Sequence, residues 1–220
     1  MKRLARALFL LPAATELARY RLSRLVLGEE RAFLGLTERL ARFTGYPGLY
    51  LRAATYRWVL RRSSPDVHIG FGTVFSKPAA ILGDHAYIGR HCSLGWVVIE
   101  RDVMLADGVA VPSGGRTHQL SGASRVPPRE MENRYQPIRV GQGSWVGSRA
   151  VILADVGQFC IIGAGAVVTK PIPDFSVAFG VPARITGSTV DRSQWPRPAE
   201  SPSFEEPECL WAPAGPGQTR

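Results

Sequence analysis

Hydrophobic residues in the middle of the chain recur about every six positions. Seven steps carry an aliphatic or aromatic residue through Ile69, Phe75, Leu82, Ile88, Leu94, Ile99, Leu105 and Val111. A small or β-branched residue stands two positions before each of them, at Val67, Thr73, Ala80, Ala86, Cys92, Val97, Val103 and Val109. Neither a helix nor a flat sheet repeats every six residues. The pattern predicts short strands joined by tight corners.

The same spacing predicts which side chains point inward. Side chains alternate along a strand, so each hydrophobic residue and the residue two before it face the same way. Three such steps close a triangular coil, and stacked coils bury one aliphatic column. The period returns at Val140, Val146, Ile152, Ile162 and Val168, preceded by Ile138, Ser144, Ala150, Cys160 and Ala166. The step from Ile152 to Ile162 is ten residues, which predicts one shortened corner.

The flanking regions differ from this repeat. Residues 1–62 read as a basic amphipathic helical segment, interrupted at Gly28 and at 45–48, with a stripe at Leu17, Tyr20, Leu25, Phe33, Leu36, Leu40 and Phe43. Residues 189–220 are rich in Pro, Ser and Glu without a period, which predicts a disordered tail. We therefore expect a repeat domain over 63–188, with an excursion over 112–139 that leaves the six-residue period.

The net charge of +9 lies entirely in the first part of the chain. Residues 1–62 hold 13 Lys or Arg against 4 Glu, whereas the remaining 14 basic and 14 acidic residues cancel. A basic, apolar-rich segment suits an anionic membrane surface, and a plain solvated face is the alternative. Nucleic acid is not expected as a partner, because no nucleic-acid-binding motif accompanies the charge.

The compartment is inferred from the N-terminus and the cysteines. The first apolar run is interrupted by Pro12, lacks a signal-cleavage site and is too short to span a bilayer. The odd number of cysteines, at Cys92, Cys160 and Cys209, suits a reducing compartment. We expect a cytoplasmic protein, with peripheral contact at the inner face of the membrane as a further expectation from the charge.

The period, the stretches "GSWVGSRAVILADVG" and "IIGAGAVVTKPIPDFSVAFGVPAR", and the break "GGRTHQL" together resemble the hexapeptide-repeat acyltransferases over residues 67–187. The lead-in "ERAFLGLTERLARFTGYPGLYLRAATYR" resembles a bacterial sugar and polysaccharide O-acetyltransferase subgroup. The resemblance implies a mainly β fold, a left-handed parallel β-helix, assembled as a homotrimer. It also implies transfer of an acetyl or other short acyl group from acyl-coenzyme A to a hydroxyl or amine of a sugar or lipid-linked glycan.

His118 is the candidate general base, because it stands at the start of the excursion beside two glycines. A neutral imidazole can take a proton from an alcohol or amine as it attacks a thioester. Many relatives carry an acidic residue soon after this histidine, whereas no carboxylate follows here before Glu130. Glu130, Glu132 or a backbone carbonyl could orient the ring instead.

The candidate cofactor-binding residues are Trp145, Gly165, Lys170 and Arg184. Trp145 is expected to face out of the coil, as a wall for the acyl or pantetheine chain or as a contact with a neighbouring subunit. Lys170 and Arg184 follow the last regular coil and could bind the phosphates. Acetyl-coenzyme A is the expected co-substrate, and no metal is expected.

Two other functions remain open. A non-catalytic trimeric scaffold would explain the missing acid. A zinc protein like the γ-class carbonic anhydrases would need three histidines that converge on one metal. Only His118 of the four histidines lies in the break, and the spacing directs His85 and His91 to different faces of the coil.

Overall fold

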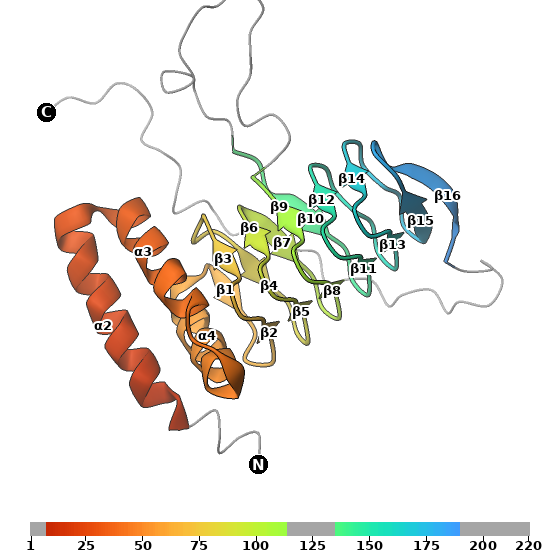
Figure 1. The fold of residues 1–220 in the computed structure, drawn as a ribbon. Coiled ribbons are helices and arrows are strands. Elements are labelled where there is room, and N and C mark those ends of the chain that lie inside the picture. The colour runs from red at the N-terminus through yellow and green to blue at the C-terminus, as the bar shows by residue number, and fades with distance from the viewer. Residues whose placement is uncertain (1–7, 114–134, 190–220) are drawn as a thin grey trace, which may run out of the picture. The chain divides into compact units, whose positions relative to one another are not determined.

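The structure is a computed structural model that describes residues 8–113 and 135–189, all within one compact unit. Three helices precede a parallel β-solenoid (Figure 1): α2 (Leu10–Leu27), α3 (Glu29–Ala41) and α4 (Gly45–Val59). Gly28 ends α2 with a φ of 78°, as expected from its position. The sequence at 45–48 opens α4 instead of interrupting a helix, because the break between α3 and α4 lies just before it, at residues 42–44.

The solenoid has three sides, each a parallel sheet of short strands. Side A consists of β1 (Arg62–Ser63), β4 (Ile81–Leu82), β7 (Val97–Ile99) and β10 (Ile138–Val140). Side B consists of β2 (His68–Ile69), β5 (Tyr87–Ile88), β8 (Met104–Leu105), β11 (Trp145–Val146), β13 (Ile161–Ile162) and β15 (Ser176–Phe179), with β16 (Arg184–Ser188) antiparallel at its end. Side C consists of β3 (Val74–Phe75), β6 (Ser93–Leu94), β9 (Ala110–Val111), β12 (Val151–Ile152) and β14 (Val167–Val168).

The inward positions predicted from the period form the core. Every one of the predicted hydrophobic positions is at most 1% exposed, and the residues two before them are at most 5% exposed. The mainly β, parallel β-helix fold class is thereby confirmed. The predicted disordered tail lies outside the described residues except for Thr189, as does most of the excursion.

Two of the three corners repeat the same turn. At the corner from side A to side B, residues with positive φ stand at His85, Asp102, Gly143, Phe159 and Phe175. At the corner from B to C they stand at Gly72, His91, Gly108, Arg149 and Gly165. Each of these residues lies three positions before an inward residue, so the inward residues on the two sides of such a corner are six positions apart. A residue in this region of φ reverses the chain within a tight turn.

The third corner, from side C to side A, varies in length. Its steps run from Phe75 to Leu82, Leu94 to Ile99, Val111 to Val140, Ile152 to Val156 and Val168 to Ile172, which are seven, five, 29, four and four positions. Val156 joins side A through bridges to Val140 and Ile172. The ten-residue step after Ile152 is therefore a four-residue corner followed by a regular six.

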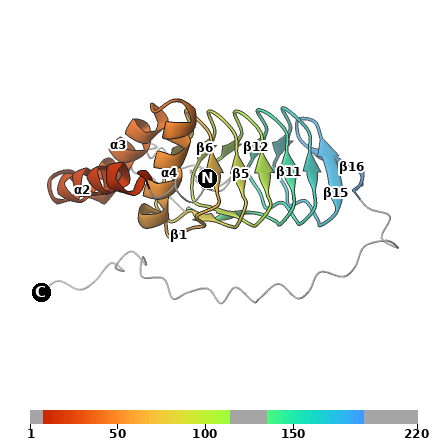
Figure 2. The ribbon, with the colours of Figure 1, turned by 90° about the horizontal axis from the view of Figure 1, so that it is seen from below.

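Helices α3 and α4 cover the first end of the coil (Figure 2). The buried Arg52 guanidinium donates to the carbonyls of Ile69, Leu40 and Phe43 at 2.6–3.1 Å. Thr37 Oγ1 accepts from the backbone N–H of Phe75 at 2.9 Å. These directional bonds join the helices to the coil, beyond the apolar contact between them.

The predicted helical stripe is only partly buried. Tyr20, Phe33, Leu36 and Leu40 are at most 6% exposed, whereas Leu25 is 84% and Phe43 is 44% exposed. Leu25 follows Tyr20 by five residues, and at 3.6 residues per turn this places it on the other side of α2. Within the helical stripe, Leu25 and Phe43 therefore face outward while the four buried residues pack inward.

Candidate functional site

The excursion leaves and rejoins the coil at the corner from C to A, and its two ends are held together. Ser113 Oγ accepts from the backbone N–H of Trp96 at 2.8 Å, and the Ser113 carbonyl accepts from Gln136 N at 3.3 Å. The Ile138 N–H donates to the Trp96 carbonyl at 3.0 Å. We call Trp96, Ser113 and Gln136 the neck. His118 itself lies outside the described residues.

The coil that precedes the neck leaves space for Ser113 at Gly95. A Cβ on Gly95 would lie 2.5 Å from Ser113 Oγ and 2.7 Å from Ser113 N, so only glycine leaves room for this contact. On the returning side, Arg139 Nε donates to Glu100 Oε1 at 2.6 Å, and Gln142 N donates to Glu100 Oε2 at 2.7 Å. The excursion is thus anchored at both ends.

The neck also connects to the helices. Lys77, at the same corner one coil earlier, stands 4.1 Å from the ring centroid of Tyr135. Its ammonium group is 2.7 Å from Glu30 on α3. Lys77 therefore links the helical segment to the residue that precedes Gln136.

Trp145 lies on side B, with its side chain outward and 45% exposed. The strand register stacks it between Met104 and Ile161, in an outward column with Tyr87. Side B is the side opposite the corner from C to A. Within one chain, the neck and Trp145 therefore face different directions, a separation that the six-residue period does not indicate.

The other three candidate cofactor residues gather around β14. Gly165 is at the corner before this strand, with a φ of 68° and open space where a Cβ would stand. Lys170 is exposed at the corner after it. Arg184 is exposed and directly follows Ala183, whose N–H donates to the Val167 carbonyl at 2.8 Å. Lys170 and the neck share the corner from C to A, two coils apart.

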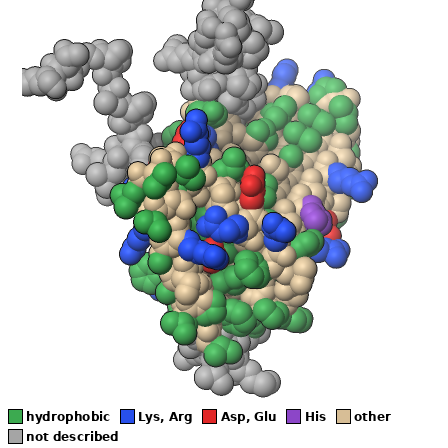
Figure 3. Space-filling model, turned by 60° about the vertical axis from the view of Figure 1, so that its left-hand side comes forward, with side chains coloured by type: hydrophobic (Ala, Val, Ile, Leu, Met, Phe, Trp, Pro, Cys, Tyr) green, Lys and Arg blue, Asp and Glu red, His purple; other side chains and the backbone are tan. Residues whose placement is uncertain are grey.

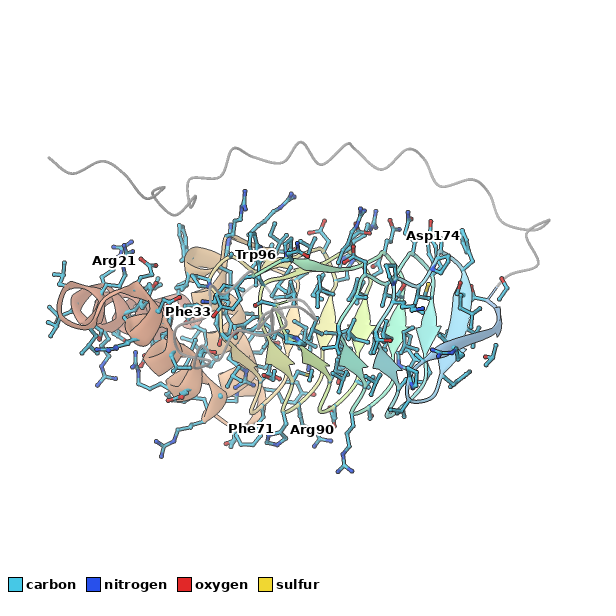
Figure 4. The ribbon with its side chains drawn as sticks, turned by 90° about the horizontal axis from the view of Figure 1, so that it is seen from above. Arg21, Phe33, Phe71, Arg90, Trp96 and Asp174 are labelled. Carbon is cyan, nitrogen blue, oxygen red and sulfur yellow. The ribbon has the colours of Figure 1, made fainter. Side chains whose placement is uncertain are left out.

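The opposite edge of the coil carries an ordered ion pair, and Figure 4 shows Arg90 there, across the coil from Trp96. Asp107 accepts from the Arg90 backbone N–H at 2.7 Å and from its guanidinium at 2.8 and 3.0 Å. These bonds, the backbone one first, hold the pKa of the Asp107 carboxyl below its ordinary value. The pair ties two successive coils together.

The described cysteines are buried, and the described histidines lie apart from one another. Burial raises the pKa of the Cys92 and Cys160 thiols, so they are packing groups and not nucleophiles. His68 stacks on Tyr87 on side B, while His85 and His91 stand at two different corners. Within residues 8–113 and 135–189, no three His, Cys, Asp or Glu side chains are grouped to hold a metal ion.

Comparison with known proteins addresses the repeat directly. Residues 137–170 match the family profile described as the hexapeptide repeat of succinyl-transferase. The chain is 45% identical to the galactoside O-acetyltransferase of Escherichia coli K12 over 134 residues, and 32% identical to the serine acetyltransferase of Haemophilus influenzae over 123 residues. The repeat of this chain therefore resembles that of the hexapeptide-repeat acyltransferases.

The extent of these similarities is limited. They cover 59% and 55% of this chain, but 57% and 37% of the two relatives. A maltose O-acetyltransferase from Clostridium difficile 630 shares the fold of the hexapeptide-repeat domain with a TM-score of 0.64. That comparison has 22% sequence identity and covers 74% of this chain and 88% of the other.

Sequence reasoning missed the residues that hold the excursion of this hexapeptide-repeat domain. Trp96 and Ser113 were not candidates, although the short five-residue step from Leu94 to Ile99 marks the corner where Trp96 lies. Lys77 stands in the seven-residue step at the same corner. Departures from the period were the available signal, because each of them falls at one corner.

Proposed function

We propose that the protein transfers an acetyl or other short acyl group from acyl-coenzyme A to a hydroxyl or amine of a sugar acceptor. The observation that carries the proposal is a histidine-bearing excursion, anchored at both ends, in a repeat of an acyltransferase family. The similarity to the galactoside O-acetyltransferase supports a sugar as acceptor. Acyl-coenzyme A is a cytoplasmic metabolite, so the proposed site of action is the cytoplasm.

In the proposed reaction, His118 acts as general base. Its neutral imidazole takes the proton from the acceptor oxygen or nitrogen while that atom attacks the thioester carbonyl. The carbon–sulfur bond then breaks, and the imidazolium returns the proton to the coenzyme A thiolate. The acceptor gains the acyl group and no covalent enzyme intermediate forms. Glu130, Glu132 or a backbone carbonyl would orient the ring.

We propose that the working site forms between two copies in a homotrimer. The neck and Trp145 lie on opposite sides of one coil, so a pocket lined by both needs a neighbouring chain. The exposed column of Tyr87, Met104 and Trp145 is the apolar surface for such a contact. Lys170 and Arg184 are proposed to bind the coenzyme A phosphates, and Gly165 to let the cofactor approach the backbone.

The acceptor class is tested by thiol release from acetyl-coenzyme A. Neutral sugars, amino sugars and lipid-linked glycans would be offered separately, and the product examined by mass spectrometry for an added acetyl group. We expect release to depend on one acceptor class. A sugar attached to a membrane lipid suits the basic charge of residues 1–62.

A non-catalytic scaffold is the second candidate, and the absence of an acid between His118 and Glu130 favours it. Calorimetric titration with coenzyme A separates the two candidates. A folded trimer that fails to bind coenzyme A would overturn the acyltransferase and leave the scaffold.

A further inference from the structure

Helix α2 has an inner face that is specified in detail. Ala13, Glu16 and Tyr20 are buried against α3 and α4. The Glu16 carboxylate accepts from Arg39 Nε on α3 at 3.1 Å, and the Tyr20 hydroxyl donates to Glu29 at 2.8 Å. These bonds fix which side of α2 turns outward.

The outer face of α2 is apolar and uncovered. Leu11, Leu22 and Leu25 are 77%, 66% and 84% exposed. Their spacing of eleven and three residues places them on one side of the helix, with Ala18 between them, opposite the buried Tyr20. We call Leu11, Ala18, Leu22 and Leu25 the outer stripe. Because α3 and α4 already cover the coil, the stripe is not needed to bury the core.

Arginines border the outer stripe on both sides. Arg19 and Arg21 stand about 80° either way from Leu11 around the helix axis, at 3.6 residues per turn. Figure 3 shows apolar side chains of the helical end interspersed with Lys and Arg. Arg21 projects from the helix (Figure 4) and has no ion-pair partner among the described side chains. An apolar stripe between cations is the pattern of a helix that lies in a lipid interface.

The charge of the helical segment favours a lipid surface over a second copy of the chain as the partner that covers the outer stripe. A second copy would bring another segment of net charge +9 against the first, so like charges would oppose the contact. An anionic lipid surface is complementary to the arginines and accepts the leucines among its acyl chains. No helix of the described residues is long and apolar enough to cross a membrane.

We propose that the outer stripe of α2 docks the protein on anionic membranes, with Leu11, Leu22 and Leu25 entering the interface and Arg19 and Arg21 contacting the headgroups. This attachment does not depend on the acyl-transfer chemistry. Helices α3 and α4 stay on the coil as its cap. A lipid-linked acceptor would then meet the enzyme at the surface on which it is carried.

Co-sedimentation of the full chain with vesicles tests the proposal. Equal parts of phosphatidylglycerol and phosphatidylcholine provide the anionic surface, and phosphatidylcholine alone the neutral one. The triple variant Leu11→Gln, Leu22→Gln, Leu25→Gln keeps good helix formers, and its binding should weaken about 100-fold. Arg21→Gln should weaken binding about fivefold at low salt, and less at physiological salt, where screening acts within about 8 Å.

Ile185→Gln is the matched control, because Ile185 is 54% exposed on β16, at the far end of the coil from the helices (Figure 2). It should bind vesicles as the wild type does. Circular dichroism and thermal unfolding check that each variant folds. If the triple variant does not fold, Arg21→Gln still tests the proposal.

Three results would overturn the proposal. One is full-length protein that stays in the supernatant with anionic vesicles at low salt. Another is a folded triple variant that binds as well as the wild type. The third is a triple variant whose particle size falls in light scattering while its vesicle binding is unchanged, which would assign the outer stripe to a second copy.

Discussion

The corners from A to B and from B to C differ sharply from the corner from C to A. At the first two, the position after the inward residue is most often glycine, and its Cβ would meet the backbone of the next coil, as at Gly89 and Gly147. At the third corner this position holds Ser76, Gly95, Pro112, Leu153 and Thr169. Two corners thus hold the repeat in register, and the third tolerates side chains and changes of length.

This difference explains where the excursion arises. Lengthening a regular corner would displace a positive-φ turn and the ladders on both sides of it. Lengthening the third corner costs mainly loop-closure entropy, about 0.6 kcal/mol for each doubling of length. A long loop can therefore be inserted there without loss of the coil, provided that its ends are tied, as they are by Ser113 and Glu100.

The largest expected effect concerns the excursion. His118→Ala should lower turnover by about 10²- to 10⁴-fold, because the attacking group loses its base. Coenzyme A affinity and particle size should change little, since the coil and its corners are untouched. Steady-state kinetics and calorimetry measure the two quantities.

Gln119→Ala is the control for His118→Ala, because it alters the adjacent residue of the excursion. It should retain most of the activity. If His118→Ala is as active as the wild type, His118 is not the base, and the excursion has another role.

The regular corners are tested by Gly147→Val. A Cβ at this position would stand 2.5 Å from Ala164 N, so the variant should lose about 2–3 kcal/mol of unfolding free energy. Thr169→Val places the same side chain at the equivalent position of the third corner and should change stability by less than about 0.5 kcal/mol. Urea unfolding measures both.

Equal losses in Gly147→Val and Thr169→Val would contradict the distinction between the corners. A larger loss for Thr169→Val would reverse it. Both variants should keep the coil circular dichroism signal at low temperature, so that the comparison concerns stability and not misfolding.

Most of the coil was predictable from the sequence because its chemistry is local and repeated. Ile69, Leu105 and Ile162 are inward for the same reason, namely alternation along a two-residue strand. Val156 was not predictable in this way. It joins side A through isolated bridges to Val140 and Ile172 after a four-residue step, so the period alone does not indicate it.

The candidate site was less predictable because its parts are far apart in the sequence. The period placed the Trp145 side chain outward. To know whether Trp145 lies on the same side of the coil as the excursion, one must follow the chain through every corner between them. Trp96 meets Ser113 only because the steps between them return the chain to the same corner. The role of Leu25 also needed the structure, because only the packing of α3 and α4 shows which face of α2 is inner.

Two buried serines, one at a regular corner and one at the corner from C to A, offer a smaller test of the difference between these corners. Ser144 Oγ donates to the Gly157 carbonyl at 2.7 Å and accepts from Cys160 N at 2.9 Å, between successive coils. Ser144→Ala leaves both groups without these bonds and should cost about 2 kcal/mol of unfolding free energy. Ser113→Ala acts on the neck, so it should reduce turnover by about tenfold with a smaller loss of stability. Thermal unfolding and kinetics of both variants measure these effects. If the neck served stability alone, Ser113→Ala would lower the unfolding free energy and leave turnover unchanged.

The smallest expected effect concerns the residues beyond the last regular coil. Arg184→Glu should weaken coenzyme A binding about fivefold, because an exposed arginine beside β14 would contact a phosphate in solvent. It should weaken dephospho-coenzyme A less, if the contact is with the 3′-phosphate. Arg149→Glu makes the same change of charge at an exposed position of a regular corner and should leave both affinities nearly unchanged. Equal losses in the two variants would mean that the coil attracts the cofactor by its general charge, and the assignment of a phosphate to Arg184 would fall. A loss confined to Arg184→Glu would place the cofactor phosphates at the end of the coil, near the corner that Lys170 shares with the neck.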